Sequence, residues 1–152
     1  MLAPLQLRDY RVATLSYEHQ SAEPRPEEDN VDIGVALGFE MEFAWDEEQK
    51  AHCLTLLTSF NEEGVPEDQK PYVAHRGHIE VQGWFRWIDN EVATQDNSER
   101  LLLVNGLSML YGIARTRVAD VTSTGPGKRL LLPSISFLPI VSDWIEEEET
   151  AS

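Results

Sequence analysis

One segment, residues 31–46, constrains the fold more than any other part of the chain. Apolar side chains occupy every second position, with small or acidic residues between them. A period of two places one whole set on a single face of a β-strand, whereas a helix would scatter it. The segment therefore predicts one long strand, with a bend or bulge at Gly34 or Gly38. Its alternating apolar residues are Val31, Ile33, Val35, Leu37, Phe39, Met41, Phe43 and Trp45.

Three other segments carry strand signals. Residues 5–18, 50–60 and 72–88 are rich in β-branched and aromatic residues and are separated by polar, mostly acidic loops. This composition is typical of strands. Short polar connections between successive strands favour antiparallel hairpins over parallel crossovers.

The second half of the chain predicts a helix, an extended segment and another helix. Apolar residues recur at helical spacing over 99–121. The apolar stretch LLLPSISFLP at 130–139 is extended, and a short amphipathic helix follows from Pro139 to Ile145. The acidic residues 146–152 are predicted to form a disordered tail.

Strands followed by helices predict an α+β fold, with a four-stranded antiparallel sheet that carries the long helix and the short C-terminal helix on one face. A length of 152 residues suits one domain, which we assign to residues 1–145. The long helix contains Gly106 and Gly112, which cost about 1 kcal/mol each relative to alanine. We expect close approach of another helix or sheet to offset this cost.

The charge of the chain limits its partners. The formal net charge is −15, which argues against nucleic acid and anionic lipid because both require a basic surface. A basic or unfolded polypeptide is the more natural partner.

The single cysteine and the N-terminal sequence bear on the compartment. Cys53 has no partner for an intrachain disulfide, which fits a reducing compartment. The N-terminus lacks the basic and apolar regions of a secretory signal, and no apolar run approaches the ~20 residues of a membrane helix. We expect a cytoplasmic protein.

No catalytic, cofactor or metal site is predicted. His75 and His78 form an H-x-x-H motif, but residues three apart on a strand face opposite sides. The turn STGPGKR contains Gly125, Gly127 and Lys128 but does not match the phosphate-binding loop, and it follows a helix instead of a strand.

Apolar surface is the remaining candidate for function. A four-stranded sheet has two faces, and two modest helices cover about one of them. The aromatic residues are either core or part of an oligomer interface and an exposed groove for peptides, and we favour the latter. The residues expected to line this client-binding groove are Val35, Leu37, Phe39, Trp84, Phe85, Leu138 and Trp144.

The order of several motifs resembles the SecB export-chaperone family, including the SecB-like chaperones of toxin–antitoxin systems. The similarity spans about residues 5–145. Ser16, Tyr17 and Glu18 match the end of the family's first strand, and HIEVQGWF resembles its Glu-Val-Gln strand. LLLPSISF, after the long helix and its glycine-containing loop, is the best local match.

The resemblance implies a dimer of dimers that holds unfolded clients in apolar grooves without ATP. It also implies subunit contacts through strand edges and the long helix, where we expect Gly106, Leu110 and Gly112. Glu18 and Glu80 match positions that dock the SecA motor, but Thr14 replaces an expected acid and the C-terminus is acidic. These departures favour a specialised SecB-like protein over an export role.

These observations leave three functions open. The first is a SecB-like holdase for unfolded preproteins. The second is a dedicated binding partner or chaperone of one protein, such as an antitoxin. The third is a small hydrolase with an unrecognised site, which requires an enclosed polar pocket.

Overall fold

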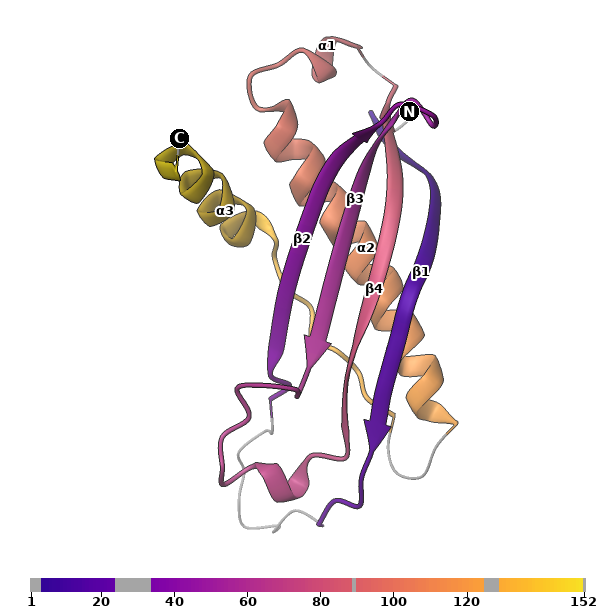
Figure 1. The fold of residues 1–152 in the computed structure, drawn as a ribbon, viewed down its shortest axis with the longest axis vertical. Coiled ribbons are helices and arrows are strands. Elements are labelled where there is room, and N and C mark those ends of the chain that lie inside the picture. Colours follow the sequence, from indigo (N-terminus) through magenta and orange to yellow (C-terminus); the bar gives the residue numbers. More distant parts are fainter. Residues whose placement is uncertain (1–3, 24–33, 89, 125–128, 152) are drawn as a thin grey trace.

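The computed structural model describes residues 4–23, 34–88, 90–124 and 129–151 (Figure 1). The expected α+β fold, with an antiparallel sheet, a long helix and a C-terminal helix, is confirmed. The elements in chain order are β1 (Leu5–His19), β2 (Leu37–Asp46), β3 (Ala51–Phe60), the 3-10 helix η1 (Lys70–Tyr72), β4 (His75–Trp87), α1 (Asn90–Ala93), α2 (Ser98–Ser123) and α3 (Leu138–Ala151).

The four strands are antiparallel in the order β1-β4-β3-β2, so that β1 and β2 form the two edges of the sheet. The pairing of β1 with β4 shifts register between Leu7 and Asp9 and again between Val12 and Thr14. The pairing of β2 with β3 is continuous. Bulges protect an edge from pairing with another chain, and β2 has no such irregularity.

The strand β2 is shorter than the alternation predicted. It begins at Leu37, which pairs with Phe60 at the end of β3. Just before it, the Ala36 N–H donates to Asn61 Oδ1 (3.0 Å), and the Asn61 N–H donates to the Ala36 carbonyl (2.8 Å). Ala36 therefore hydrogen-bonds to the loop after β3, because β3 ends at Phe60 and has no further residue with which to pair. Val31 and Ile33 lie outside the described residues.

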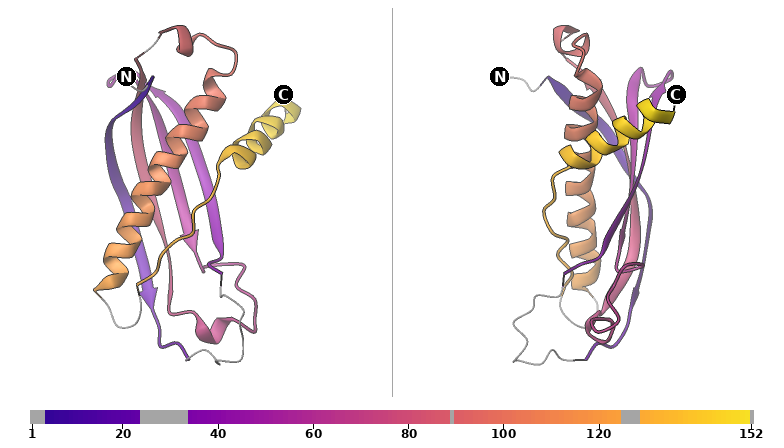
Figure 2. Two further views of the ribbon diagram at one scale, coloured as in Figure 1. Left: turned by 180° about the vertical axis from the view of Figure 1, so that it is seen from behind. Right: turned by 90° about the vertical axis from the view of Figure 1, so that its left-hand side faces the viewer.

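The helix α2 covers one face of the sheet, called the inner face here, by packing against β3 and β4 (Figure 2). A Cβ placed on Gly106 would lie 2.4 Å from Leu54 Cδ1. The glycine therefore allows close approach of helix and sheet within one chain. The prediction that Gly106 and Leu110 lie at a subunit interface is wrong for this reason, since Leu110 is also fully buried in the core.

The segment between α2 and α3 is extended, as predicted, and lies along α2 (Figure 2). The final helix is longer than expected, because α3 continues through the acidic residues to Ala151. Glutamate is a good helix former, and residues 146–151 are helical where a disordered tail was expected. No helix in the described ranges has the length and apolar character needed to cross a membrane.

Candidate functional site

The inner face of β2 is only partly covered by the rest of the chain. α2 packs against β3 and β4, and their inward side chains Leu54, Leu56 and Val81 are fully buried. The corresponding side chains of β2 lie at the margin of this helix and remain half-buried. These residues are Leu37, Phe39, Met41 and Phe43.

Three aromatic rings connect β2 to the helical layer. The Phe39 ring centroid lies 5.7 Å from that of Tyr111 in α2 and 5.4 Å from that of Phe137 at the end of the extended segment. Tyr111 and Phe137 are 5.6 Å apart. All three pairs meet edge-on, an arrangement that aromatic rings favour. The contacts fix how far β2 lies from α2.

Side chains of α2 also hold the extended segment in place. The Tyr111 hydroxyl donates to the Pro133 carbonyl (2.5 Å), and Arg115 Nε donates to the Leu132 carbonyl (2.9 Å). Burial raises the pKa of the Tyr111 phenol, so the hydroxyl keeps the proton that it donates. These hydrogen bonds fix the extended segment and so determine where α3 begins beside the sheet.

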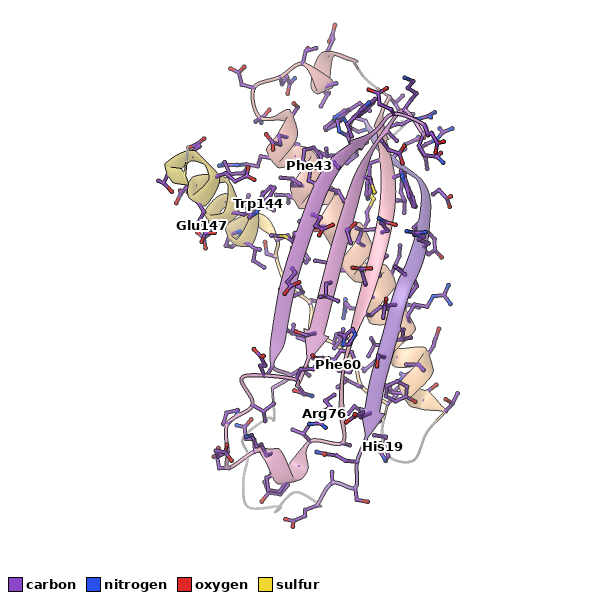
Figure 3. The ribbon with its side chains drawn as sticks, in the orientation of Figure 1. His19, Phe43, Phe60, Arg76, Trp144 and Glu147 are labelled. Atoms are coloured by element: carbon purple, nitrogen blue, oxygen red, sulfur yellow. The ribbon has the colours of Figure 1, made fainter. Side chains whose placement is uncertain are left out.

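The helix α3 lies beside the β2 edge (Figures 1 and 2). Its apolar residues Ile140, Trp144 and Ile145 pack partly against the core, and Leu138 at its start is 51% exposed. Trp144 is on the side of α3 nearer to Phe43, and Glu147 is farther away (Figure 3). The half-buried apolar residues of these two elements form what we call the β2–α3 surface. They are Leu37, Phe39, Met41 and Phe43 of β2 and Ile140, Trp144 and Ile145 of α3.

The β2–β3 hairpin end adds an aromatic cluster to this surface. His52 stacks on Phe43, with centroids 5.7 Å apart, and meets Trp45 edge-on at 4.9 Å. Trp45 is 49% exposed. Burial lowers the pKa of His52, and its Nδ1 is buried without a hydrogen-bond partner among the described residues.

Four of the seven predicted groove residues are half-buried and pack against the core beside this surface, namely Val35, Leu37, Phe39 and Trp144. A fifth, Leu138, is exposed at the start of α3. Phe85 does not line a surface, because its side chain is 0% exposed in the core. The sequence interpretation missed Met41 and Phe43 on β2 and Ile140 and Ile145 on α3, although the alternation already placed Met41 and Phe43 beside Phe39.

Trp84 lies on the opposite, outer face of the sheet, and its assignment to the same groove is wrong. Its Nε1 donates to Asp46 Oδ2 (2.9 Å), and the Arg11 guanidinium lies 5.9 Å from the ring centroid. The Asp46 pKa is lowered, first by the hydrogen bond from the Gln49 backbone and then by that from Trp84. These contacts give Trp84 a structural role in closing the hairpin.

The two proposed motor-docking acids also belong to the outer face. Glu18 accepts a hydrogen bond from Arg76 at 2.6 Å, and Glu80 shares the parity of Arg76 on β4. The exposed Glu18 carboxylate is thus already paired, whereas no ion pair to Glu80 occurs within the described ranges.

The two histidines of the H-x-x-H motif face opposite sides, as the strand geometry predicts. His75 is buried beside His19, whereas His78 on the outer face contacts Glu62 at 2.6 Å. The described residues contain no group of three or more acids, histidines or cysteines suited to a metal ion.

Gly112 differs from Gly106 in its surroundings. A Cβ on Gly112 would meet nothing within 4 Å. It lies on the outward side of α2, in a hollow of about 490 Å³ that also includes Leu7, Tyr10, Met109 and Ile113. Tyr10 and Met109 are exposed there, whereas Leu7 and Ile113 also pack partly against the core. Thr116, Arg117 and Asp120 complete the lining with polar groups.

Comparison with known proteins gives a structural relative. No protein-family model matches the chain, and no curated protein matches its sequence significantly. Among solved structures, the chain is similar to a Mycobacterium tuberculosis SecB-like chaperone in complex with a ChAD peptide from the HigA1 antitoxin. The sequence identity is 20% and the TM-score 0.52, covering 88% of this chain and 91% of that chain. This chain has the fold of a SecB-like chaperone.

The SecB-like fold confirms the fold that the sequence resemblance implied. α2 is the long helix expected from residues 99–121, and LLLPSISF forms most of the extended segment beside it. The match covers 88% of this chain, so the shared fold accounts for most of the chain.

Proposed function

We propose that this SecB-like protein is an ATP-independent holdase that binds unfolded polypeptide on the β2–α3 surface. The observation that carries the proposal is the row of half-buried apolar side chains on β2, which α2 leaves partly uncovered. Apolar burial contributes ~25 cal/mol per Å² without directional requirements. A surface of this kind accepts clients of many sequences.

The position of β2 at the sheet edge supports an extended client. An edge strand presents backbone N–H and C=O groups that pair with another chain. β2 is regular along its length, unlike β1, where two register shifts occur. Side chains of the client would then cover Phe39 and Phe43 from the open side.

A dedicated role is the second candidate. The SecB-like chaperone from Mycobacterium tuberculosis was solved with an antitoxin peptide bound. By analogy, one short antitoxin-like segment would occupy the β2–α3 surface of this protein. A pull-down that recovers many unrelated clients would contradict this narrower function.

The hydrolase alternative receives less support. His78 and Glu62 form a base and orienting carboxylate at 2.6 Å, and Ser16 and Ser59 are the cross-strand neighbours of His78. Within the described residues, neither serine hydroxyl hydrogen-bonds to His78. A nucleophile is activated by contact with its base, so these residues give the hydrolase no support.

The assembly is part of the proposal. The hollow around Gly112, Met109 and Tyr10 is suited to packing against a second copy in a dimer of dimers. Docking of SecA at Glu18 and Glu80 would require Glu18 to exchange Arg76 for a partner group. We therefore consider SecA a less favoured partner than an unfolded polypeptide.

The direct test is suppression of aggregation. A denatured client protein is diluted into buffer with an equal amount of this protein and without nucleotide, and light scattering is followed. We expect scattering to fall at a stoichiometric ratio. Unchanged scattering for several unrelated clients would contradict the general holdase function.

A further inference from the structure

The ends of β1 and β4 bring two imidazoles together, away from the β2–α3 surface. His19 (Figure 3) and His75 are direct cross-strand partners, and their Nδ1 atoms lie 3.5 Å apart. Their ring centroids are 4.9 Å apart, with an angle of 47° between the planes. The nitrogens are therefore closer than the rings, so the two Nδ1 atoms converge.

This geometry fits a shared cation better than a direct hydrogen bond. Hydrogen bonds with N–H donors in proteins span about 2.7–3.2 Å, and 3.5 Å is longer. Two imidazole nitrogens at about 2.0–2.1 Å from a tetrahedral zinc ion lie about 3.4 Å apart, with ring centroids about 5 Å apart. Both separations match those of His19 and His75. We propose that this pair is a binding site for a divalent transition-metal ion, with Zn²⁺ as the representative ligand.

Hydrogen bonds fix the backbone beside the two histidines. The Gln20 N–H donates to the Ala74 carbonyl (2.9 Å), and Asn61 Nδ2 donates to the His75 carbonyl (3.0 Å). The backbone next to each histidine is thus fixed before any ion binds. His75 is 4% exposed, whereas His19 is exposed and opens the pair to solvent.

The charge of the chain and the nearby end of β1 bear on cation binding. Tyr17 lies two residues before His19, and its hydroxyl donates to the Val121 carbonyl in the last turn of α2 (3.2 Å). The carbonyl end of a helix carries partial negative charge. The chain as a whole has a net charge of −15, which adds a long-range attraction for cations.

The site is open. No third histidine, cysteine or acidic side chain joins the pair within the described ranges, so water or a group from another molecule completes the coordination. Imidazole ligands suit zinc, copper and nickel, whereas magnesium and calcium prefer oxygen. A bound ion would join the end of β1 to the start of β4.

The experiment is a calorimetric titration of Zn²⁺ into the full chain without a histidine tag. H19Q tests the exposed ligand, and H75Q tests the buried one. H52Q and H78Q are matched controls because they remove the remaining histidines of the chain. We expect one ion per chain, at least tenfold weaker binding in H19Q and H75Q, and unchanged binding in both controls.

Two results would overturn this inference, namely a wild-type chain that binds no Zn²⁺ or tight binding that survives in H19Q. Because His19 is exposed, H19Q is informative even where H75Q fails to fold. The inference is independent of the proposed holdase function, since aggregation suppression and Zn²⁺ affinity are measured separately.

Discussion

The rings of Phe39 and Tyr111 meet at an interplanar angle of 79°, with centroids 5.7 Å apart. This contact joins the edge strand β2 to the long helix α2, and Phe137 adds a third ring from the segment that precedes α3. The same few residues therefore determine the position of both parts of the β2–α3 surface. Mutations at this junction should change the stability of the fold before they change what it binds.

Tyr111→Phe keeps the aromatic packing and removes the hydrogen bond to Pro133. We expect the free energy of unfolding to fall by about 1 kcal/mol, because one acceptor loses its partner. Urea denaturation measures this change. Tyr10→Phe is the control, since its exposed hydroxyl makes no hydrogen bond within the described residues. Equal stability of the two variants would contradict the anchoring role of Tyr111.

The two glycines of α2 provide a matched pair. Gly106→Ala and Gly112→Ala both gain helix propensity of about 1 kcal/mol. Only the first introduces a Cβ into the space of the buried Leu54 side chain, and overpacking costs typically about 1–3 kcal/mol. We expect thermal unfolding to show G112A as the more stable variant. The reverse order would contradict the packing of α2 on the sheet.

The half-buried imidazole of His52 makes stability depend on pH. Its pKa in the folded protein lies below the usual 6.5. As pH falls below 6.5, the unfolded state binds the proton first, so the free energy of unfolding decreases. His52→Gln should lose less stability than wild type between about pH 7.5 and pH 5.5. Identical pH dependence of the two proteins in urea denaturation would count against burial of this ring.

A substitution on the outward side of α2 tests whether the chain forms the proposed dimer of dimers. Met109→Asp replaces an exposed apolar side chain of the hollow beside Gly112 with a charge, whose desolvation would oppose subunit packing. We expect the solution mass, measured by light scattering during gel filtration, to drop from an oligomer to a smaller species. Met109→Leu should retain the wild-type mass. A wild-type protein that is already monomeric would refute the predicted dimer of dimers.

Much of this fold is predictable because its signals are local. The period of two in residues 37–46 and the helical spacing in residues 99–121 each specify one element without reference to the rest of the chain. The start of β2 was not predictable, because it depends on Asn61 after the next strand. The length of α3 is not predictable from the acidic run alone, because consecutive glutamates occur both in disordered tails and in solvated helices.

The functional surface was harder to predict because it depends on what α2 leaves uncovered. Trp84 and Phe85 are neighbours on one strand, and strand geometry alone places them on opposite faces. The break in alternation at Trp84 was the available signal that both could not line one groove. Gly106 and Gly112 show a different limit, since no sequence pattern tells which glycine contacts its own sheet and which faces outward.

The most direct test of the holdase account compares two half-buried tryptophans on opposite sides of the molecule. Trp144 belongs to the β2–α3 surface, and Trp84 belongs to the outer face. Client affinity is measured by fluorescence anisotropy of a labelled unfolded polypeptide, after circular dichroism shows that both variants are folded. The account predicts that Trp144→Ala weakens binding about tenfold or more, as loss of an interface aromatic does, while Trp84→Ala leaves it unchanged. Equal affinity of the two variants, or greater loss in Trp84→Ala, would contradict client binding on the β2–α3 surface.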